Sequence, residues 1–169
     1  MTPRERRLLA DLRHMDELGE SGRLTFRAEG NPPETYQVLL SVPGLARRAD
    51  GTLAVRNLHR FMLYLHRDYP RRPPVVTWLT PVFHPNLLPP ERNGGACIGR
   101  WSASESLADL CTRLADVVAY RSFNVDDALD PDAAEWVRRH GVRAGTDVSE
   151  LVRLPPPGAG RADARRVVA

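Results

Sequence analysis

The stretch HPNLLPPERNGGACIGRW, residues 84–101, contains Cys97, one of only two cysteines in the chain. Glycine and alanine precede this cysteine, and Ile98, Gly99 and Arg100 follow it. Small residues leave the backbone around a thiol uncrowded, so that a bulky partner can approach. A nearby arginine favours the thiolate, which is the nucleophilic form. These residues alone leave open both a reactive thiol and a buried structural one.

The same stretch shows no hydrophobic period from residue 83 to residue 101, and Pro, Asn and Gly dominate it. We therefore predict a long irregular loop, which in a compact domain is typically functional or disordered. Upstream, four segments rich in β-branched and aromatic residues lie between turn signals. They are RLTFRAE at 23–29, TYQVLLSV at 35–42, RFMLYLH at 60–66 and VVTWLTPVF at 75–83. Their short connections predict an antiparallel meander.

Helical spacing of apolar residues predicts one helix before these strands. Thr2 and Glu5 form a capping box around Pro3, and Gly19 and Gly22 are expected to end the helix.

Two further helices are predicted after the loop. Ser102 or Ser104 is expected to cap the first of them, and Asp130-Pro131-Asp132 opens the second, which stops near Gly141. Cys111 belongs to an apolar stripe, so we interpret it as core packing. The stripe comprises Leu107, Leu110, Cys111, Leu114, Val117 and Val118.

The overall pattern is that of an α+β domain: an N-terminal helix, a four-stranded antiparallel meander, a long loop and C-terminal helices. We predict one domain over residues 1–150 and a Pro/Gly-rich, mobile tail over residues 151–169. No apolar run is long enough to span a membrane, and the charged N-terminus is unlike a signal peptide. Two cysteines do not form a disulfide framework, so a cytoplasmic protein is expected. A net charge of +3 does not require nucleic-acid binding.

Three kinds of chemistry are open to Cys97. A hydrolase would need a base, for which His84 is the nearest candidate, but Cys and His alone are a weak signal. A zinc site built with His59, His66 and His84 lacks metal-ligand spacing. Acyl transfer through a thioester needs only an exposed thiol and a donor for the oxyanion, which the Asn86 amide can supply.

Several motifs together resemble those of the ubiquitin-conjugating enzymes, over about residues 3 to 141. The matching segments are YPRRPPVV at 69–76, HPN at 84–86, NGGACI at 93–98, Trp-Ser at 101–102 and NVDDALDPDAAEW at 124–136. The resemblance implies that Cys97 takes the C-terminus of a ubiquitin-like protein from an activating enzyme. An amine of a protein substrate then attacks that thioester. It also implies no cofactor and no metal, and partners that include neither nucleic acid nor membrane.

The resemblance also assigns roles to the neighbours of Cys97. Asn86 would stabilise the oxyanion or hold the loop that shapes the site, and His84 would fix the turn. The predicted first helix resembles the basic face that docks the activating enzyme, and its arginines are Arg4, Arg6, Arg7 and Arg13. Without the resemblance, these arginines would indicate only a solvated helix face.

The chain departs from the family pattern at several positions. Gly99 and Ser122 stand where acidic residues near the cysteine are common, and Asp126 or Asp127 could substitute for them. Arg71 replaces a frequent aromatic in the loop that contacts RING-type ligases, so a RING partner is not predicted. The protein could then act without a separate ligase. The segment between Asn86 and Cys97 is longer than usual.

All 24 basic residues are arginine, and the chain contains no lysine. A GC-rich genome explains this, and so would selection against self-modification by a reactive thioester. The composition suggests a bacterial source and a ubiquitin-like conjugation operon of the kind associated with antiphage defence. Two alternatives stay open: a catalytically inert binding module of the same fold, and a hydrolase that uses Cys97 and His84.

Overall fold

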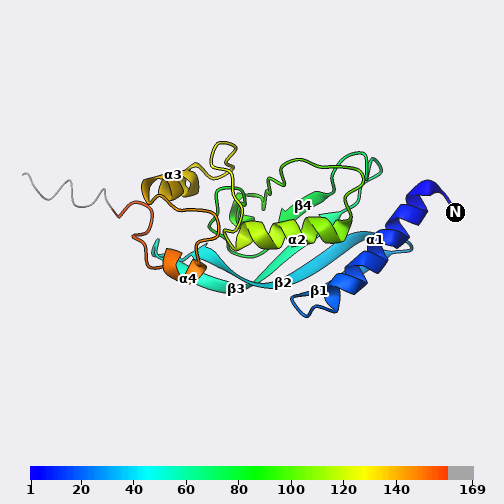
Figure 1. The fold of residues 1–169 in the computed structure, drawn as a ribbon, viewed down its shortest axis with the longest axis horizontal. Helices are drawn as coiled ribbons and strands as arrows, with labels where there is room; N and C mark the ends of the chain where they lie inside the picture. The colour runs from blue at the N-terminus through cyan, green and yellow to red at the C-terminus, as the bar shows by residue number, and fades with distance from the viewer. Residues whose placement is uncertain (160–169) are drawn as a thin grey trace, which may run out of the picture.

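The computed structural model describes residues 1–159, and the remaining ten residues of the predicted tail lie outside the described part. Helix α1 precedes four strands, and three helices follow the long loop (Figure 1). In chain order the elements are α1 (Pro3–Gly19), β1 (Leu24–Gly30), β2 (Pro33–Arg47), β3 (Leu53–Tyr64), β4 (Val75–Trp78), the 3-10 turn η1 (Pro90–Arg92), α2 (Leu107–Val118), α3 (Pro131–Arg139) and α4 (Val148–Leu151). The predicted α+β arrangement is confirmed.

The four strands form one antiparallel sheet in the order β1-β2-β3-β4. Side chains alternate between the two faces, so that Phe61 and Leu63 of β3 are buried while Tyr64 is exposed. Helix α2 lies across the sheet, α1 lies at one end of the molecule, and α3 and α4 lie at the other (Figure 1). The core therefore forms between one face of the sheet and the two helices α1 and α2.

Strands β2 and β3 extend well beyond the predicted segments. The predicted segment ends at Val42, but β2 continues past Pro43 through an irregularity in register between Ser41 and Gly44. Pairing then resumes and continues to Arg47 opposite Leu53. Strand β4 is shorter than predicted because the chain leaves the sheet after Trp78.

The helix caps agree with the sequence at two of three positions. The Thr2–Glu5 capping box and the Asp130 cap of α3 are both present. The predicted caps of α2 were wrong: Ser106, not Ser102 or Ser104, accepts from the third residue of the helix. The Ser102 and Ser104 hydroxyls lie 2.8 Å apart and bond to each other instead.

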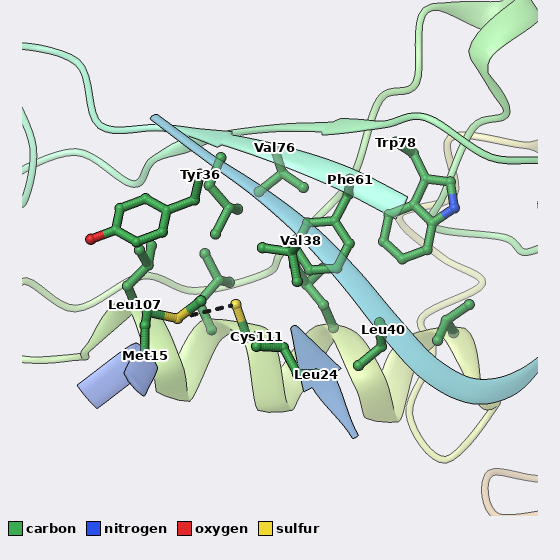
Figure 2. Packing of buried hydrophobic residues seen from close by; sticks show 14 of the residues in the cluster. Met15, Leu24, Tyr36, Val38, Leu40, Phe61, Val76, Trp78, Leu107 and Cys111 are labelled. Carbon is green, nitrogen blue, oxygen red and sulfur yellow. Dashed lines mark hydrogen bonds between the residues drawn. The ribbon is translucent and has the colours of Figure 1, made fainter. Parts of the chain in front are cut away.

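Cys111 lies in the main hydrophobic core, as predicted, with 1% of its surface exposed. Its thiol faces Met15 Sδ of α1 at 3.8 Å, among side chains from the inner face of the sheet (Figure 2). A second cluster contains Phe83, Tyr120 and Trp136 and lies where α3 and α4 meet the chain leaving the sheet.

The predicted division at residue 150 falls within α4. Leu151 is buried, and the indole Nε1 of Trp136 donates to the Pro155 carbonyl at 2.8 Å. The first part of the predicted tail therefore contacts the domain. In the part of the chain that the structure describes, no helix combines the length and the apolar character that crossing a bilayer requires.

Candidate active site

Cys97 lies in the long loop with its thiol partly exposed. Its backbone N–H donates to the Asn86 carbonyl at 2.9 Å, which joins the cysteine to the HPN turn. The Sγ atom lies 3.5 Å from Oδ2 of Asp127, in the segment between α2 and α3. Two segments far apart in sequence thus meet at the thiol.

Gly94 lets the loop approach β4 closely. Its φ of +66° lies in the left-handed region, and a Cβ there would lie 2.3 Å from the Trp78 carbonyl oxygen. In return the Gly94 carbonyl accepts from the Trp78 N–H at 2.7 Å. Position 94, three residues before Cys97, therefore requires glycine.

The Asn86 side chain is 3% exposed and fully engaged in hydrogen bonds. Its Nδ2 donates to the carbonyls of Asn124 (2.8 Å) and Asp127 (3.2 Å), and its Oδ1 accepts from the Asn124 N–H (2.8 Å). Both amide hydrogens are thus used to hold the 124–127 segment. Of the two roles predicted for Asn86, this geometry favours shaping the loop.

His84 is completely buried beside the ring of Tyr120, with ring centroids 4.6 Å apart. Its Nδ1 accepts from the Asn86 N–H at 2.9 Å. Burial lowers the pKa of His84 to about 3, so the ring stays neutral at physiological pH. The imidazole fixes the HPN turn, and its burial and this bond argue against a role as the base of a hydrolase.

Of the two acids proposed to replace the missing ones, Asp127 is the one beside the thiol. Asp126 instead forms an ion pair with Arg138 at 3.1 Å. The Asn124 Oδ1 accepts from the backbone N–H groups of both aspartates, at 2.9 and 3.3 Å, and so sets the direction of this turn. Ser122 and Gly99 line the pocket beside the thiol and supply no charge there.

A pocket opens between Cys97 and helix α2. Leu110, Leu114 and Val117 of α2 supply much of its apolar lining, and Arg113 and Asp116 add charge.

Arg113 was not predicted as a site residue, yet it holds the segment that follows the cysteine. Its Nη1 donates to the Ile98 carbonyl at 2.5 Å, and its Nη2 lies 2.7 Å from Glu105 Oε1. Its position on α2, two residues after Cys111, indicates only that its side chain lies outside the apolar stripe. The contact with Ile98 depends on the tertiary fold, so sequence spacing could not reveal it.

Three of the four arginines predicted to bind a partner form hydrogen bonds within the chain, Arg6 to the Met1 carbonyl at 3.1 Å. Arg4 donates to the carbonyls of Leu65 (2.8 Å) and Tyr69 (2.9 Å) and pairs with a glutamate of β2. Arg7 bonds Asp11, the Tyr69 hydroxyl and two carbonyls of the segment before α2. Arg6 and Arg13 are exposed.

Asp11 connects α1 to the β3–β4 loop and to the start of α2. It is buried, with 1% of its surface exposed. Its carboxylate accepts from the Tyr69 hydroxyl at 2.6 Å, from the Leu107 N–H at 2.9 Å and from Arg7 Nε at 2.8 Å. The Trp101 indole donates to the Pro70 carbonyl at 2.8 Å. The Tyr-Pro and Trp motifs are therefore structural parts of one junction.

Within residues 1–159, no cluster of three or more His, Cys, Asp or Glu side chains suits a metal ion.

Comparison with known proteins identifies this arrangement. The family model described as "Ubiquitin-conjugating enzyme" matches residues 23–151. The chain belongs to the ubiquitin-conjugating enzyme family. Membership supports a transferase role in ubiquitin-like conjugation in general.

Relatives of this ubiquitin-conjugating enzyme family member match most of its length. "Ubiquitin-conjugating enzyme E2 2" of Candida glabrata is 29% identical, over 89% of this chain and 86% of the relative. The protein of the same name from Saccharomyces cerevisiae is 28% identical, over 89% and 83%. Among solved structures, S. cerevisiae Ubc12 aligns with a TM-score of 0.62 and 26% identity, over 90% of this chain and 78% of that one. A putative ubiquitin-conjugating enzyme from Trypanosoma cruzi aligns with a TM-score of 0.61 and 19% identity, over 88% and 96%, which supports the fold.

Proposed function

We propose that this protein is a ubiquitin-like protein conjugating enzyme with Cys97 as its nucleophile. It accepts the C-terminus of a ubiquitin-like protein from an activating enzyme and transfers it to an amine of a protein substrate. The observation that carries the proposal is the partly exposed Cys97 thiol, 3.5 Å from the Asp127 carboxylate and beside a pocket lined by residues of α2.

The first step is exchange of one thioester for another. The Cys97 thiolate attacks the carbonyl carbon of the activating enzyme's thioester, a new S–C bond forms, and the activating enzyme's thiolate leaves. No oxidant or cofactor is needed, because the acyl group is only transferred from one sulfur atom to another. The pocket beside α2 would then hold the end of the carried protein, with Leu110 and Leu114 against its apolar atoms.

In the second step an amine attacks the Cys97 thioester. The C–N bond forms, the Cys97 thiolate leaves, and the amine gives up one proton. Asp127 is placed to attract the incoming ammonium group and to accept that proton. Asn86 acts by holding the 124–127 segment, and hence the Asp127 carboxylate, at the thiol.

We further propose a bacterial source, a cytoplasmic location and a role in antiphage defence. These rest on the arginine-only, Ala- and Pro-rich composition and on association with bacterial conjugation operons. The lysine content of the neighbouring gene products separates the two explanations of the missing lysines. Abundant lysine there would support selection against self-modification, whereas uniform lysine depletion would support genome composition.

The proposal is tested by incubating the protein with an activating enzyme, the ubiquitin-like protein that this enzyme activates, and ATP. We expect an adduct that reducing agents cleave, absent from Cys97→Ala and present in Cys111→Ala. The Cys111 variant is the matched control, because it removes the other thiol. Absence of any adduct with an active upstream enzyme would favour an inert binding module. Cleavage of a preformed conjugate by the protein alone would favour the hydrolase.

A further inference from the structure

A second pocket lies between the end of α1, the first strands of the sheet and helix α2, and we call it the α1–α2 pocket. Its volume of about 420 Å³ is typical of sites for small molecules. Leu24 and Leu40 of the sheet lie beside Cys111 of α2 in its wall (Figure 2). The apolar lining comprises Leu18, Leu24, Leu40, Val42, Cys111 and Ala115.

The α1–α2 pocket reaches the hydrophobic core. Four of its lining side chains are buried members of the main cluster: Leu24, Leu40, Val42 and Cys111. At its mouth the lining residues Arg23 and Arg121 are exposed. Water in such a pocket contacts apolar side chains, which is unfavourable. An apolar ligand that displaces this water would therefore be stabilised.

The charge at the mouth favours an anion. Within residues 1–159, Arg23 forms no ion pair. Arg121 pairs with Asp116, the acidic residue of the lining, at 3.4 Å and with 52% of its own side chain exposed. An exposed pair of this kind contributes little to stability, so Arg121 can turn toward a ligand at small cost. The lining thus has one more positive than negative charge.

We propose that the α1–α2 pocket binds a small amphipathic anion, a single saturated chain that ends in a carboxylate. The apolar wall contacts the chain, and the guanidinium groups of Arg23 and Arg121 bind the carboxylate, which suits their bidentate geometry. A membrane phospholipid shares the chemistry of an apolar chain with an anionic head. The volume of about 420 Å³ suits one short chain rather than the two long chains of a phospholipid, which favours the free anion.

The α1–α2 pocket is distinct from the pocket beside Cys97. Leu110 and Leu114 line the pocket beside the thiol, whereas Cys111 and Ala115 line this one, so the two open on different sides of α2. Binding therefore neither uses the Cys97 thiol nor rests on the proposed function.

Asp116 gives a local readout of binding, because it lines both pockets. Its carbonyl accepts from the Arg121 N–H at 2.9 Å and from the Ser122 N–H at 3.3 Å. A ligand that draws Arg121 toward the mouth should shift the amide signals of both residues.

The test uses decanoate, below its micelle concentration, as the probe. Titration into the isotope-labelled protein should shift amide signals around Arg23, in residues 111–116 and at residues 121–122. Octanoate should bind about tenfold more weakly, because two fewer CH₂ groups are buried. Decyltrimethylammonium has the same chain length and the opposite charge, and it should bind at least about tenfold more weakly than decanoate.

Two variants test the mouth and the wall separately. Arg23→Glu should weaken decanoate binding by about fivefold or more, because it reverses an exposed charge at the mouth. Ala115→Phe should abolish saturable binding by filling the pocket. The matched control, Arg143→Glu, reverses an exposed arginine after α3 and should change the Kd less than about twofold. Arg23 is exposed, so its test stands even if Ala115→Phe does not fold.

Four results would overturn the proposal. The first two are equal weakening by Arg23→Glu and Arg143→Glu, and equal affinity for decanoate and decyltrimethylammonium. The third is a set of shifts centred on the pocket beside Cys97 or on the outer face of the sheet around Arg27 and Arg60. The fourth is co-sedimentation with phosphatidylglycerol vesicles that Arg23→Glu abolishes, which would assign the pocket to a membrane lipid.

Cys97→Ala should bind decanoate with unchanged affinity. Failure of the parent protein to form a thioester, with decanoate binding intact, would contradict the proposed function alone. The two proposals therefore fail separately.

Discussion

The two cysteines of this protein occupy opposite kinds of surroundings. Cys97 lies in an irregular loop, partly exposed and 3.5 Å from a carboxylate. Cys111 lies on α2 in the core against Met15, where burial raises the pKa of its thiol well above the usual range (Figure 2). The comparison teaches that the apolar stripe around Cys111 and the glycine-rich loop before Cys97 already distinguish the two thiols in sequence, and that the tertiary fold adds the carboxylate beside Cys97.

The largest contrast between the two cysteines should appear in alkylation. Iodoacetamide reaches Cys97 directly, whereas Cys111 must wait for an opening of the core that costs most of the unfolding free energy. We expect Cys97 to react at least about 10⁴-fold faster in the native protein, measured by mass spectrometry over time. In denaturant the two rates should converge. Comparable native rates would show that the core around Cys111 opens readily.

A large effect is also expected from the two buried histidines, His84 and His59. Burial lowers the pKa of His84 to about 3 and of His59 to about 4, below the ordinary value of 6.5. The unfolded chain therefore binds protons that the native state does not, so stability is full above pH 6.5 and falls as pH decreases. Each histidine should cost about 2 kcal/mol between pH 7 and pH 5, measured by urea unfolding. A free energy of unfolding that stays constant between pH 7 and pH 5 would contradict this assignment.

In the loop that contains Cys97, substitution of one glycine should lower the free energy of unfolding. Gly94→Ala places a Cβ 2.3 Å from the Trp78 carbonyl oxygen and forces a positive φ on alanine. We expect a loss of about 3 kcal/mol in the free energy of unfolding. Gly141→Ala is the matched control: its φ is +58° but the space around it is open. It should lose only about 1 kcal/mol, and equal losses would remove the close approach as the cause.

The smallest expected effect concerns Asp127, whose carboxylate lies beside the Cys97 thiol. Asp127→Asn should slow transfer to lysine by about tenfold or more, because the group that attracts the amine and takes its proton is lost. Thioester formation on Cys97 should stay nearly unchanged, as followed in single-turnover discharge assays. Asp126→Asn, which alters an exposed partner of Arg138, should discharge at the parental rate. Equal slowing by both variants would assign the effect to the loop as a whole.

Much of the fold could be predicted because local signals agreed with the global arrangement. The Thr2 and Asp130 caps, the α2 stripe with Cys111 and the antiparallel strands all depend on residues close in sequence. The irregularity that lets β2 continue past Pro43 depends on pairing with β3, which spacing alone does not reveal.

The site was predictable in its motifs but not in its bonds. The HPN turn and the cysteine were identified, yet Asp127 is favoured over Asp126 only because Asn86 and Asn124 hold that segment. The start of α2 follows a local signal, the capping box of Ser106 and Asp109, whereas the bond from the Leu107 N–H to Asp11 joins residues 96 positions apart. Of the four arginines predicted to bind a partner, Arg4 and Arg7 also bond carbonyls of distant segments, contacts that sequence spacing does not reveal.

The central claim, that Cys97 carries the acyl group, is tested most directly by Cys97→Ser. Charged by the activating enzyme with the ubiquitin-like protein and ATP, this variant should form an oxygen ester that survives reducing agents and is cleaved by hydroxide. Peptide mapping by mass spectrometry should place the adduct on residue 97. An adduct that reducing agents still cleave, or one mapped to Cys111, would contradict the account.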